Sequence, residues 1–430
     1  MAEAPPSFVF VHAADLHLDT PFEGIGAVAP EVAAALRDAS LDAFDALVDL
    51  TLSREAAFLL VAGDVYDGAR RGLRAQLRFR DGLKRLAAAG IQSFVVHGNH
   101  DPLDEGWSAV SRWPEGVTIF GSDAVRVVPV ERGGTQIATV QGISYATAAT
   151  TENLARRLSR PDGPGVHVGL LHCNVGGAGG HANYSPCSLD DLAATGLDYL
   201  ALGHVHERSV LARGRGPGEA WIAYPGNLQA RSPKPSEAGA KGALVVHVEH
   251  GVIAEVEFVP CDLVRFAEVR VPLDAADDLA DLRDRLVEAG RAELAGAQGR
   301  SIVLRARLVG SGTLHEDLAR PGSREALLDD LRALAPTATP FVWWDALVDE
   351  TRPALDLDEV RRRNDFSADL LAIAQRLADD RSPLAASTGL AASLPRALAR
   401  RVEAILEGAT RRELVEEATL VALEAIEREP

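Results

Sequence analysis

Cysteine, lysine and long apolar runs are scarce in this sequence, and each absence excludes a class of protein. The 430 residues include only three cysteines, Cys173, Cys187 and Cys261, and no CxxC pair. Disulfide scaffolds and thiolate zinc sites are thereby excluded, and a reducing cytoplasm suits the chain. No apolar run approaches the roughly 20 residues of a membrane span, and no basic region precedes the first apolar stretch. We therefore expect a cytoplasmic protein without a signal peptide or a membrane segment.

Excess positive charge is also absent. Only three of the 44 basic residues are lysine, and the formal net charge is −18. A field of this sign repels polyanions, so nucleic acid can bind only where basic residues cluster. Hydrophobic residues make up 47% of the chain, which excludes disorder as its main state and allows a core that needs no disulfide.

The first half of the chain alternates apolar runs with helical stretches, which predicts an α/β domain. Buried strands are expected at residues 8–11, 58–62, 94–96, 166–171 and 199–202. Helices are expected between them, near residues 31–54, 70–89 and 188–195. Further strand-like runs follow one another without a helix, at residues 117–121, 125–130 and 135–142. Part of the sheet should therefore be antiparallel.

The second half divides into two regions of different pattern. Strands at 265–271, 301–309 and 341–348, with helices near 274–295 and 323–334, predict a small α+β domain. From about residue 354 the pattern is helical, and Phe366, Leu370, Ile373 and Leu377 recur on one helix face. We therefore expect three domains, at residues 1–261, 262–352 and 353–430.

Five short polar segments each follow a predicted strand, which is where α/β folds place ligand sites. Side chains at positions i and i+2 of an extended chain point the same way, so that two residues of one segment can act together. The segments are Asp15-Leu16-His17, Gly63-Asp64-Val65-Tyr66-Asp67, Gly98-Asn99-His100-Asp101, Leu171-His172-Cys173-Asn174 and Gly203-His204-Val205-His206.

The donors in these segments are carboxylate and amide oxygens and imidazole nitrogens, without a thiolate. This mixture favours Mn²⁺, Fe²⁺ or Zn²⁺ over Ca²⁺ and Mg²⁺, which prefer oxygen alone. Two ions that share a bridging carboxylate would use all the donors, as in sites that cleave phosphoesters. His100 then remains as a proton donor for the leaving oxygen. The seven metal-ligand candidates are Asp15, His17, Asp64, Asn99, His172, His204 and His206.

The order DxH, GDxxD, GNHD, H and GHxH resembles the calcineurin-like metallophosphoesterases, whose fold is a four-layer α/β/β/α sandwich. The longer segments ADLHLDTPF, LLHCNVGG, HANYSPCSLDDL, LDYLALGHVHER and YPGNLQAR are similar to the YhaO branch of the SbcD-type DNA repair exonucleases. The resemblance covers about residues 8–260 strongly and the later regions in arrangement only. It implies a capping domain after the nuclease domain and a helical C-terminal tail.

The resemblance also implies a role for each site residue. The ligands of one ion would be Asp15, His17, Asp64 and His206. Those of the other would be Asp64, Asn99, His172 and His204, with Asp64 bridging. Manganese is the implied ion, and His100 is the implied catalytic proton donor. Residues expected to support the site from behind are Asp67, Asp101 and His97. Archaeal and eukaryotic double-strand-break nucleases carry His in the place of Asp67, so their substrate-rotation role is not transferred to it.

Substrate contacts are expected from residues near the motifs. Residues 70–85 carry seven basic residues against one acidic residue, and Arg70, Arg74 and Arg78 share one helix face. Such a face is usually only solvated, but its place beside a phosphoester site makes phosphate contact an equal alternative. His181 and Asn227 are further candidates. No base-reading motif is present, so contact with DNA should be independent of sequence.

The motifs predict an enzyme that cleaves phosphoesters, and the resemblance implies a manganese-dependent phosphodiesterase, an exonuclease that acts at DNA ends. Two alternatives stay open: a metallophosphatase for small phosphoesters or phosphoproteins, and a regulatory subunit of an ATPase complex whose metal site is structural. The 224 residues after His206 favour a polymer or a partner over a small substrate, and His100 argues against a purely structural site. The resemblance suggests that the C-terminal helices dock an SMC-like, SbcC-type ATPase, and a homodimer would match the family.

Overall fold

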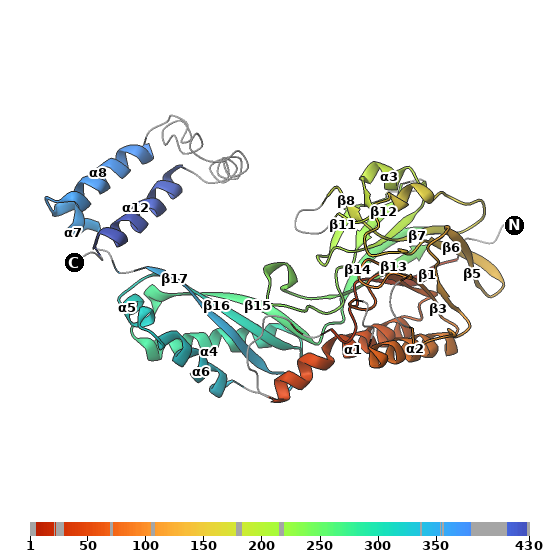
Figure 1. Ribbon diagram of the computed structural model, residues 1–430, viewed down its shortest axis with the longest axis horizontal. Coiled ribbons are helices and arrows are strands. Elements are labelled where there is room, and N and C mark those ends of the chain that lie inside the picture. The colour runs from red at the N-terminus through yellow and green to blue at the C-terminus, as the bar shows by residue number, and fades with distance from the viewer. Residues whose placement is uncertain are drawn as a thin grey trace. The chain divides into compact units, whose positions relative to one another are not determined.

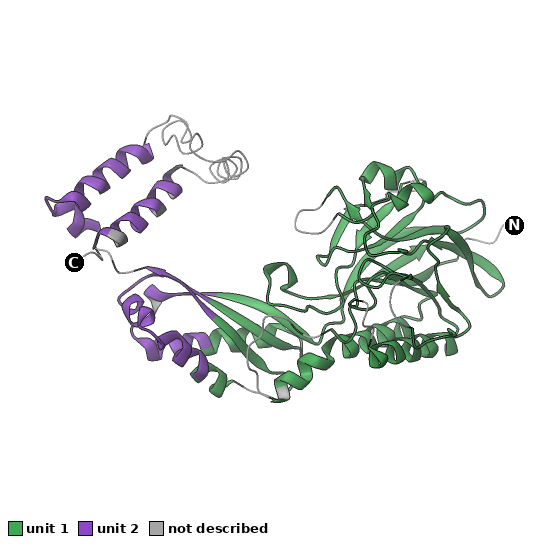
Figure 2. Ribbon diagram, viewed as in Figure 1, with its two compact units in different colours: residues 1–269, 287–306, 330–346 green, residues 270–286, 307–329, 347–430 purple. Residues whose placement is uncertain are grey.

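The computed structural model divides the chain into two compact units (Figure 2). Unit 1 comprises residues 1–269, 287–306 and 330–346, and unit 2 comprises residues 270–286, 307–329 and 347–430. The residues that the structure describes are 6–20, 22, 30–68, 72–104, 108–177, 183–214, 219–335, 338–352, 354, 357–379 and 411–427.

The first large sheet of unit 1 has six strands in the order β14-β13-β1-β2-β3-β4 (Figure 1). These strands are β1 (Phe8–Ala13), β2 (Phe58–Ala62), β3 (Gln92–Val96), β4 (Val117–Ile119), β13 (Gly242–Glu249) and β14 (Val252–Pro260). The first four run parallel, whereas β13 pairs antiparallel with β1 and β14 with β13. The carboxyl ends of β1, β2 and β3 therefore meet at one side of the sheet.

The second large sheet has the order β11-β12-β10-β7-β6-β5. Its strands are β5 (Arg126–Arg132), β6 (Thr135–Gly142), β7 (Val166–His172), β10 (Tyr199–Gly203), β11 (Ser209–Ala212) and β12 (Trp221–Tyr224). Four of them run parallel, and β5 and β11 are antiparallel to their neighbours. The antiparallel part that the sequence predicts is present, in the pair β5 and β6. The strands β11 to β14 were not predicted in the sequence analysis. A short ribbon of β8 (Asn174–Val175) and β9 (Pro186–Cys187) follows β7.

Alternating side chains along the strands explain the layers of unit 1. In β1, Phe10 belongs to the core between the two sheets, and Val11 belongs to the core under the helices. In β10, Ala201 faces the first sheet and Leu202 faces outward. Each sheet therefore has two apolar faces, and helices cover the outer ones (Figure 1). Helices α1 (Pro30–Ser53) and α2 (Leu73–Ala88) cover the first sheet, and α3 (Leu189–Ala193) covers the second. The predicted α/β/β/α sandwich is confirmed.

Helices α1 and α2 approach each other at Gly82. A Cβ placed there would lie 2.4 Å from Cε1 of Phe44 and 3.1 Å from Cγ2 of Val48. Phe44 is fully buried and packs on Phe79 with ring centroids 5.2 Å apart, so it has little room to retreat. Glycine at this position sets the spacing of the two helices.

A small sheet with the order β15-β16-β17 comes next in the chain. The elements of this region are β15 (Val264–Pro272), α4 (Leu279–Gly296), β16 (Ser301–Ser311), α5 (Leu314–Ala319), α6 (Ser323–Leu334) and β17 (Val342–Arg352). They include the strands and helices expected of the α+β region. Because its residues are shared between the two units, the domain boundaries at 261/262 and 352/353 stay predictions.

The last described elements are helical, as expected: α7 (Leu357–Arg362), α8 (Phe366–Asp379) and α12 (Arg411–Glu427). Leu371 of α8 packs in a small apolar cluster with residues of α7 and α12. The apolar face noted in the sequence is largely outside this cluster, since Phe366 is 69% and Ile373 52% exposed. Leu370 of that face does pack against the cluster, beside the buried Leu371. Within the described segments, no helix is both long and apolar enough to cross a membrane.

Replacing Gly82 with alanine is expected to destabilise unit 1, although alanine is the better helix former. The crowded Cβ should cost about 1–3 kcal/mol, which outweighs a gain of about 1 kcal/mol in helix propensity. Gly296→Ala is the matched control, because a Cβ at the end of α4 meets nothing within 4 Å. Urea unfolding measures both variants, and equal stability of the two would contradict the tight contact at Phe44.

Candidate metal centre

The five polar segments meet at the carboxyl ends of parallel strands from both large sheets. Three segments follow β1, β2 and β3, and the other two lie at the ends of β7 and β10. From the first sheet come Asp15, His17, Asp64, Asn99 and His100. From the second come His172, His204 and His206. All seven predicted ligands and the predicted proton donor are therefore brought to one place.

The backbone at these strand ends adopts conformations that are rare for residues with a side chain. Asp15, His17, Asp64 and His204 have φ angles of 51°, 43°, 50° and 104°. Positive φ in non-glycine residues is uncommon and is concentrated at functional sites. The amide of Asp15 donates to the Gly63 carbonyl at 3.1 Å, and the amide of His17 donates to the Asp64 carbonyl at 3.0 Å. These bonds between strand ends hold the strained backbone and aim the side chains inward.

His172 lies directly against the backbone, so its neighbours must be glycine. A Cβ at Gly63 would lie 2.2 Å from Nδ1 of His172, and one at Gly98 would lie 2.7 Å from Nε2. Nδ1 is 2.9 Å from the Ala62 carbonyl oxygen, to which it donates. In the neutral ring, Nε2 therefore carries the lone pair that faces the other donors.

One group of donors surrounds this Nε2 atom. It lies 3.3 Å from Oδ2 of Asp64 and 3.1 Å from Oδ1 of Asn99. The same amide oxygen of Asn99 lies 3.2 Å from Nδ1 of His204. Asp15, Asp64 and His172 each offer a donor atom within 4.8 Å of the others. Five of the predicted ligands are thus linked to one another by short distances between donor atoms.

A second group lies around His17. Its Nε2 is 3.2 Å from Nε2 of His206 and 4.0 Å from Oδ2 of Asp64. Asp15, His17 and His206 offer donor atoms within 4.8 Å of one another. Nδ1 of His17 is buried and has no hydrogen-bond partner among the described residues. Two facing imidazole nitrogens repel each other through their lone pairs unless a proton or a cation lies between them.

Burial and neighbouring charges decide the protonation of these groups. Burial raises the pKa of Asp15, against the opposing charges of His172 and His206. Burial alone would also raise the pKa of Asp64, but the charge and hydrogen bond of His172 outweigh it and lower that pKa. Burial opposes the charge of His172, yet Asp64 and Asp15 raise its pKa to about 9. Without metal, a proton on His172 therefore compensates the buried carboxylates.

The residues present fit divalent metal ions. Two buried carboxylates require nearby positive charge, and the facing nitrogens of His17 and His206 require an electron-pair acceptor. A divalent cation satisfies both requirements. Asp64 lies within reach of both His17 and His172, so its carboxylate is placed to bridge the two groups. The individual ligand assignments stay predictions.

His100 stands at the edge of the two groups, with its side chain 38% exposed. Its Nδ1 donates to Oδ1 of Asp67 at 2.5 Å, and Nη1 of Arg231 donates to Oδ2 of the same carboxylate at 2.8 Å. The hydrogen bond raises the pKa of His100 and lowers that of Asp67. His17, Asp67 and His100 also offer donor atoms within 4.8 Å of one another. Held through Nδ1, the imidazole can present Nε2 to a substrate.

Asp101 ties the second segment to the third. Its Oδ2 accepts hydrogen bonds from the amide of Val65 at 2.9 Å and from Nδ1 of His97 at 2.8 Å. Its Oδ1 accepts from the amide of Gly98 at 2.8 Å. The carboxylate is fully buried. These contacts are of the kind expected for Asp101 and His97, because they fix the loop that carries Asn99 and His100.

Comparison with known proteins agrees with this geometry. The family model described as calcineurin-like phosphoesterase matches residues 8–208. The model described as metallophosphoesterase YhaO, middle domain, matches residues 266–352. The chain is 36% identical over 350 residues to a Bacillus subtilis protein called "Uncharacterized metallophosphoesterase YhaO", over 81% of this chain and 83% of that protein. The chain belongs to the YhaO family of calcineurin-like metallophosphoesterases.

Two more distant similarities accompany this assignment. A "DNA double-strand break repair protein Mre11" from Thermoplasma acidophilum is 25% identical over 258 residues, which are 57% of this chain and 65% of that protein. The crystal structure of a dimetal phosphatase from Danio rerio matches with 13% identity and a TM-score of 0.33, over 57% of this chain and 93% of that one. The resemblance found in the motifs is confirmed by the family matches, and the chain is a metallophosphoesterase.

The basic face of α2 in this metallophosphoesterase is paired with acidic residues of α1. Nη2 of Arg74 lies 2.8 Å from Oδ1 of Asp38, and Nε of Arg78 donates to Oδ1 of Asp45 at 3.0 Å. These carboxylates compete with any phosphate for the same guanidinium groups. Phosphate contact by this face stays a prediction without geometric support. Arg70 and His181 lie outside the described residues.

Asn227 lies behind the site rather than at its surface. It is fully buried, and its Nδ2 donates to the Gln229 carbonyl at 3.1 Å and to Oε2 of Glu237 at 2.8 Å. The predicted contact between Asn227 and substrate stays a prediction without geometric support, because the side chain is fully buried. Its role in the structure is to hold Glu237.

No role for Glu237 or Arg231 is named in the sequence analysis. Burial alone would raise the pKa of Glu237, but hydrogen bonds and charge from His206 lower it to about 2. Arg231 holds Asp67 and ends the segment YPGNLQAR, which was the one available signal for it. No local pattern marks Glu237, because its partner His206 lies 31 residues away along the chain.

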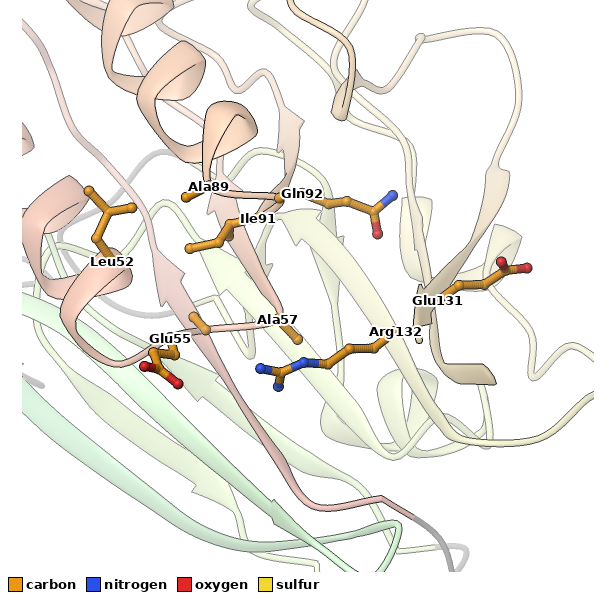
Figure 3. A pocket seen from close by; sticks show the side chains of 10 residues that line it. Leu52, Glu55, Ala57, Ala89, Ile91, Gln92, Glu131 and Arg132 are labelled. Carbon is orange, nitrogen blue, oxygen red and sulfur yellow. The ribbon is translucent and has the colours of Figure 1, made fainter. Parts of the chain in front are cut away.

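A cavity of about 310 Å³ lies elsewhere in unit 1 (Figure 3). Ala57 lies just before β2, Gln92 opens β3, and Arg132 ends β5. Figure 3 shows the side chain of Arg132 reaching toward Ala57. These positions are at the amino ends of β2 and β3, whereas the polar segments follow the carboxyl ends. The cavity is therefore separate from the candidate metal centre.

Binding of Mn²⁺ to the metal-free protein is expected to release a proton. The pKa of His172 is raised from 6.5 to about 9, so the ring is protonated at neutral pH and must lose its proton to become a ligand. The Mn²⁺ affinity should therefore rise with pH through this window and level off above about pH 9. Calorimetric titration in two buffers of different ionisation enthalpy counts the released protons. His172→Gln should remove the share of this release that comes from the ring, and an affinity that ignores pH would contradict the assignment.

Proposed function

We propose that this metallophosphoesterase is a DNA exonuclease that uses two Mn²⁺ ions to hydrolyse phosphodiester bonds at DNA ends. The observation that carries the proposal is the convergence of seven donor side chains, Asp64 among them, with His100 held beside them by Asp67. Divalent ions in such a centre activate water and neutralise the charge that develops on a phosphoryl group. The donor mixture of nitrogen and oxygen favours Mn²⁺, with Fe²⁺ and Zn²⁺ as the competing ions.

His100 is the proton donor in this proposal. Its side chain is 38% exposed, whereas that of His17 is 1% exposed, so a substrate can reach the first ring and not the second. The hydrogen bond from Nδ1 to Asp67 keeps the ring in place, and the raised pKa of His100 favours the protonated form. Nε2 can then donate to the oxygen that leaves phosphorus. Arg231 fixes the other oxygen of Asp67 and so prevents the carboxylate from turning away.

DNA is the proposed substrate because of the chain's relatives and its size. The Thermoplasma relative carries the printed description of a DNA double-strand break repair protein. The formal net charge of −18 opposes DNA at long range, so binding has to come from local contacts to phosphates, without readout of base sequence. Such contacts should make binding fall steeply with salt.

We also propose that α8 contributes to docking of an SMC-like ATPase. Phe366 and Ile373 of this helix are more than half exposed, and Val421 of α12 is 55% exposed. Isolated apolar side chains on a surface need no explanation, but three of them on one helix pair supply contacts that a partner helix could cover.

Replacing His100 with alanine is expected to keep both metal ions and to lower turnover by about 10²–10⁴-fold, because the leaving oxygen loses its proton donor. Metal content is measured by elemental analysis, and turnover by hydrolysis of a phosphodiester in Mn²⁺. His247→Ala is the control, because that residue pairs with Glu257 on β14, outside the five segments. Loss of bound metal in the His100 variant would instead place this ring in the coordination shell.

The proposed substrate is tested with linear DNA labelled at one end, as a duplex and as a single strand. Mn²⁺-dependent shortening from one end, absent in His100→Ala, is the expected result and also gives the polarity. A wild-type protein that binds both ions and cleaves small phosphoesters but leaves DNA intact would contradict the exonuclease proposal.

A further inference from the structure

The segment between β12 and β13 carries a buried carboxylate that contacts the metal centre from behind. Oε1 of Glu237 lies 2.8 Å from Nδ1 of His206. Oε2 accepts hydrogen bonds from Nδ2 of Asn227 at 2.8 Å and from the amide of Arg231 at 3.0 Å. The side chain of Glu237 is only 7% exposed. Each oxygen of this carboxylate therefore has its own partner, and the two cannot be exchanged.

The main chain of His206 is held by the same segment. Nζ of Lys241 donates to the His206 carbonyl at 3.0 Å and to the Ser236 carbonyl at 3.2 Å. Lys241 is 5% exposed, so its ammonium group is buried and bonds to these carbonyls rather than to solvent. The backbone and the ring of His206 are thus fixed independently, by Lys241 and by Glu237.

A carboxylate can only accept hydrogen bonds, so the contact with Glu237 places the imidazole proton on Nδ1 of His206. Nε2 then carries the lone pair of the ring, and it is this atom that lies 3.2 Å from Nε2 of His17. The Nδ1 atoms of the three other imidazole ligands have different surroundings. Nδ1 of His172 donates to a main-chain carbonyl, and Nδ1 of His204 faces Asn99 inside the centre. Nδ1 of His17 lies 3.9 Å from Oδ1 of Asp67 and makes no hydrogen bond among the described residues. At hydrogen-bond distance, the described carboxylate contact to Nδ1 in this set is that of His206 with Glu237.

We propose that Glu237 is a positioning residue that sets the tautomer of His206, so that Nε2 is presented to a metal ion beside Asp15 and His17. The inference rests on the metal centre of the proposed function and adds to it a carboxylate that supports one ligand. A carboxylate behind a ligating imidazole fixes its orientation and increases its basicity. Glu237 touches neither substrate nor metal in this role.

Glu237→Gln changes the tautomer without changing the shape. The amide of Arg231 and Nδ2 of Asn227 are both donors, so the oxygen of the new glutamine must face them. Its NH₂ group then faces Nδ1 of His206 and donates to it, which moves the imidazole proton to Nε2. The nitrogen that faces the metal position is thereby protonated, and one ion should lose a ligand.

The test compares Mn²⁺ binding to wild-type, Glu237→Gln and Asp262→Asn proteins by calorimetric titration. Asp262 is the matched control, because it is a buried carboxylate of unit 1 that pairs with Arg265 and Arg300, outside the five segments. We expect two ions in the wild type. In Glu237→Gln, one dissociation constant should rise about 10- to 100-fold and the other should stay unchanged. Asp262→Asn should bind both ions as the wild type does.

A second measurement determines the tautomer of His206 directly in the wild-type protein. In metal-free wild-type protein labelled with ¹⁵N-histidine, the nitrogen shifts of His206 should show protonation at Nδ1. The signal is assigned from its loss in His206→Gln. In Glu237→Gln the same ring should be protonated at Nε2.

Each outcome separates this inference from the proposed function. Wild-type protein that binds two ions while His206 is protonated at Nε2, or a Glu237→Gln variant that binds both ions with unchanged affinity, would overturn the role of Glu237 and leave the metal centre standing. Wild-type protein that binds no Mn²⁺ would overturn the metal centre, and the role of Glu237 with it. If the glutamine variant does not fold, the tautomer in the wild type decides.

Discussion

The arrangement of this molecule depends on two carboxylates, Asp15 and Asp64, that are buried side by side. Charge buried in this way is costly unless opposite charge and hydrogen bonds surround it. Imidazole rings from several strand ends surround the two carboxylates. In the metal-free protein, a proton on His172 supplies the opposite charge. A centre built in this way has a strong driving force to exchange that proton for a divalent cation. The strained φ angles at Asp15 and Asp64 show that the backbone is shaped for the same purpose.

The rest of unit 1 keeps these side chains within reach of one another. Phe10 stacks on Phe58 with ring centroids 4.7 Å apart, and Phe10 meets the edge of Tyr199 from the second sheet at 5.3 Å. This packing fixes the position of the strands of one sheet relative to those of the other, and with it the positions of the strand ends that carry the polar segments. Hydrogen bonds between the segments then refine the positions, and Asp101 is the clearest example. Precision at the centre thus comes from packing far below it.

Much of the fold and most of the site could be predicted from the sequence, because the ligand candidates occupy short motifs directly after apolar strands. Side chains that act across long distances in the chain could not. Glu237 belongs to no motif, and its contact with His206 becomes evident only in the fold, where the segment between β12 and β13 places it beside that ring. The pairing of Arg78 was hidden for the same reason, since its partner Asp45 lies on another helix. On α8, two adjacent leucines leave the packed face undetermined until α12 is in place.

The centre is assembled from two sheets, and neither sheet contains a complete set of donors. The first contributes both carboxylates and the second contributes His172, His204 and His206. An ion held here would therefore cross-link the two sheets of the sandwich. Its release would weaken the contact between the sheets as well as remove a cofactor. If the chain were cut between β4 and β5, each fragment would keep only part of the donor set. Retention of metal would then report that the two fragments had reassembled.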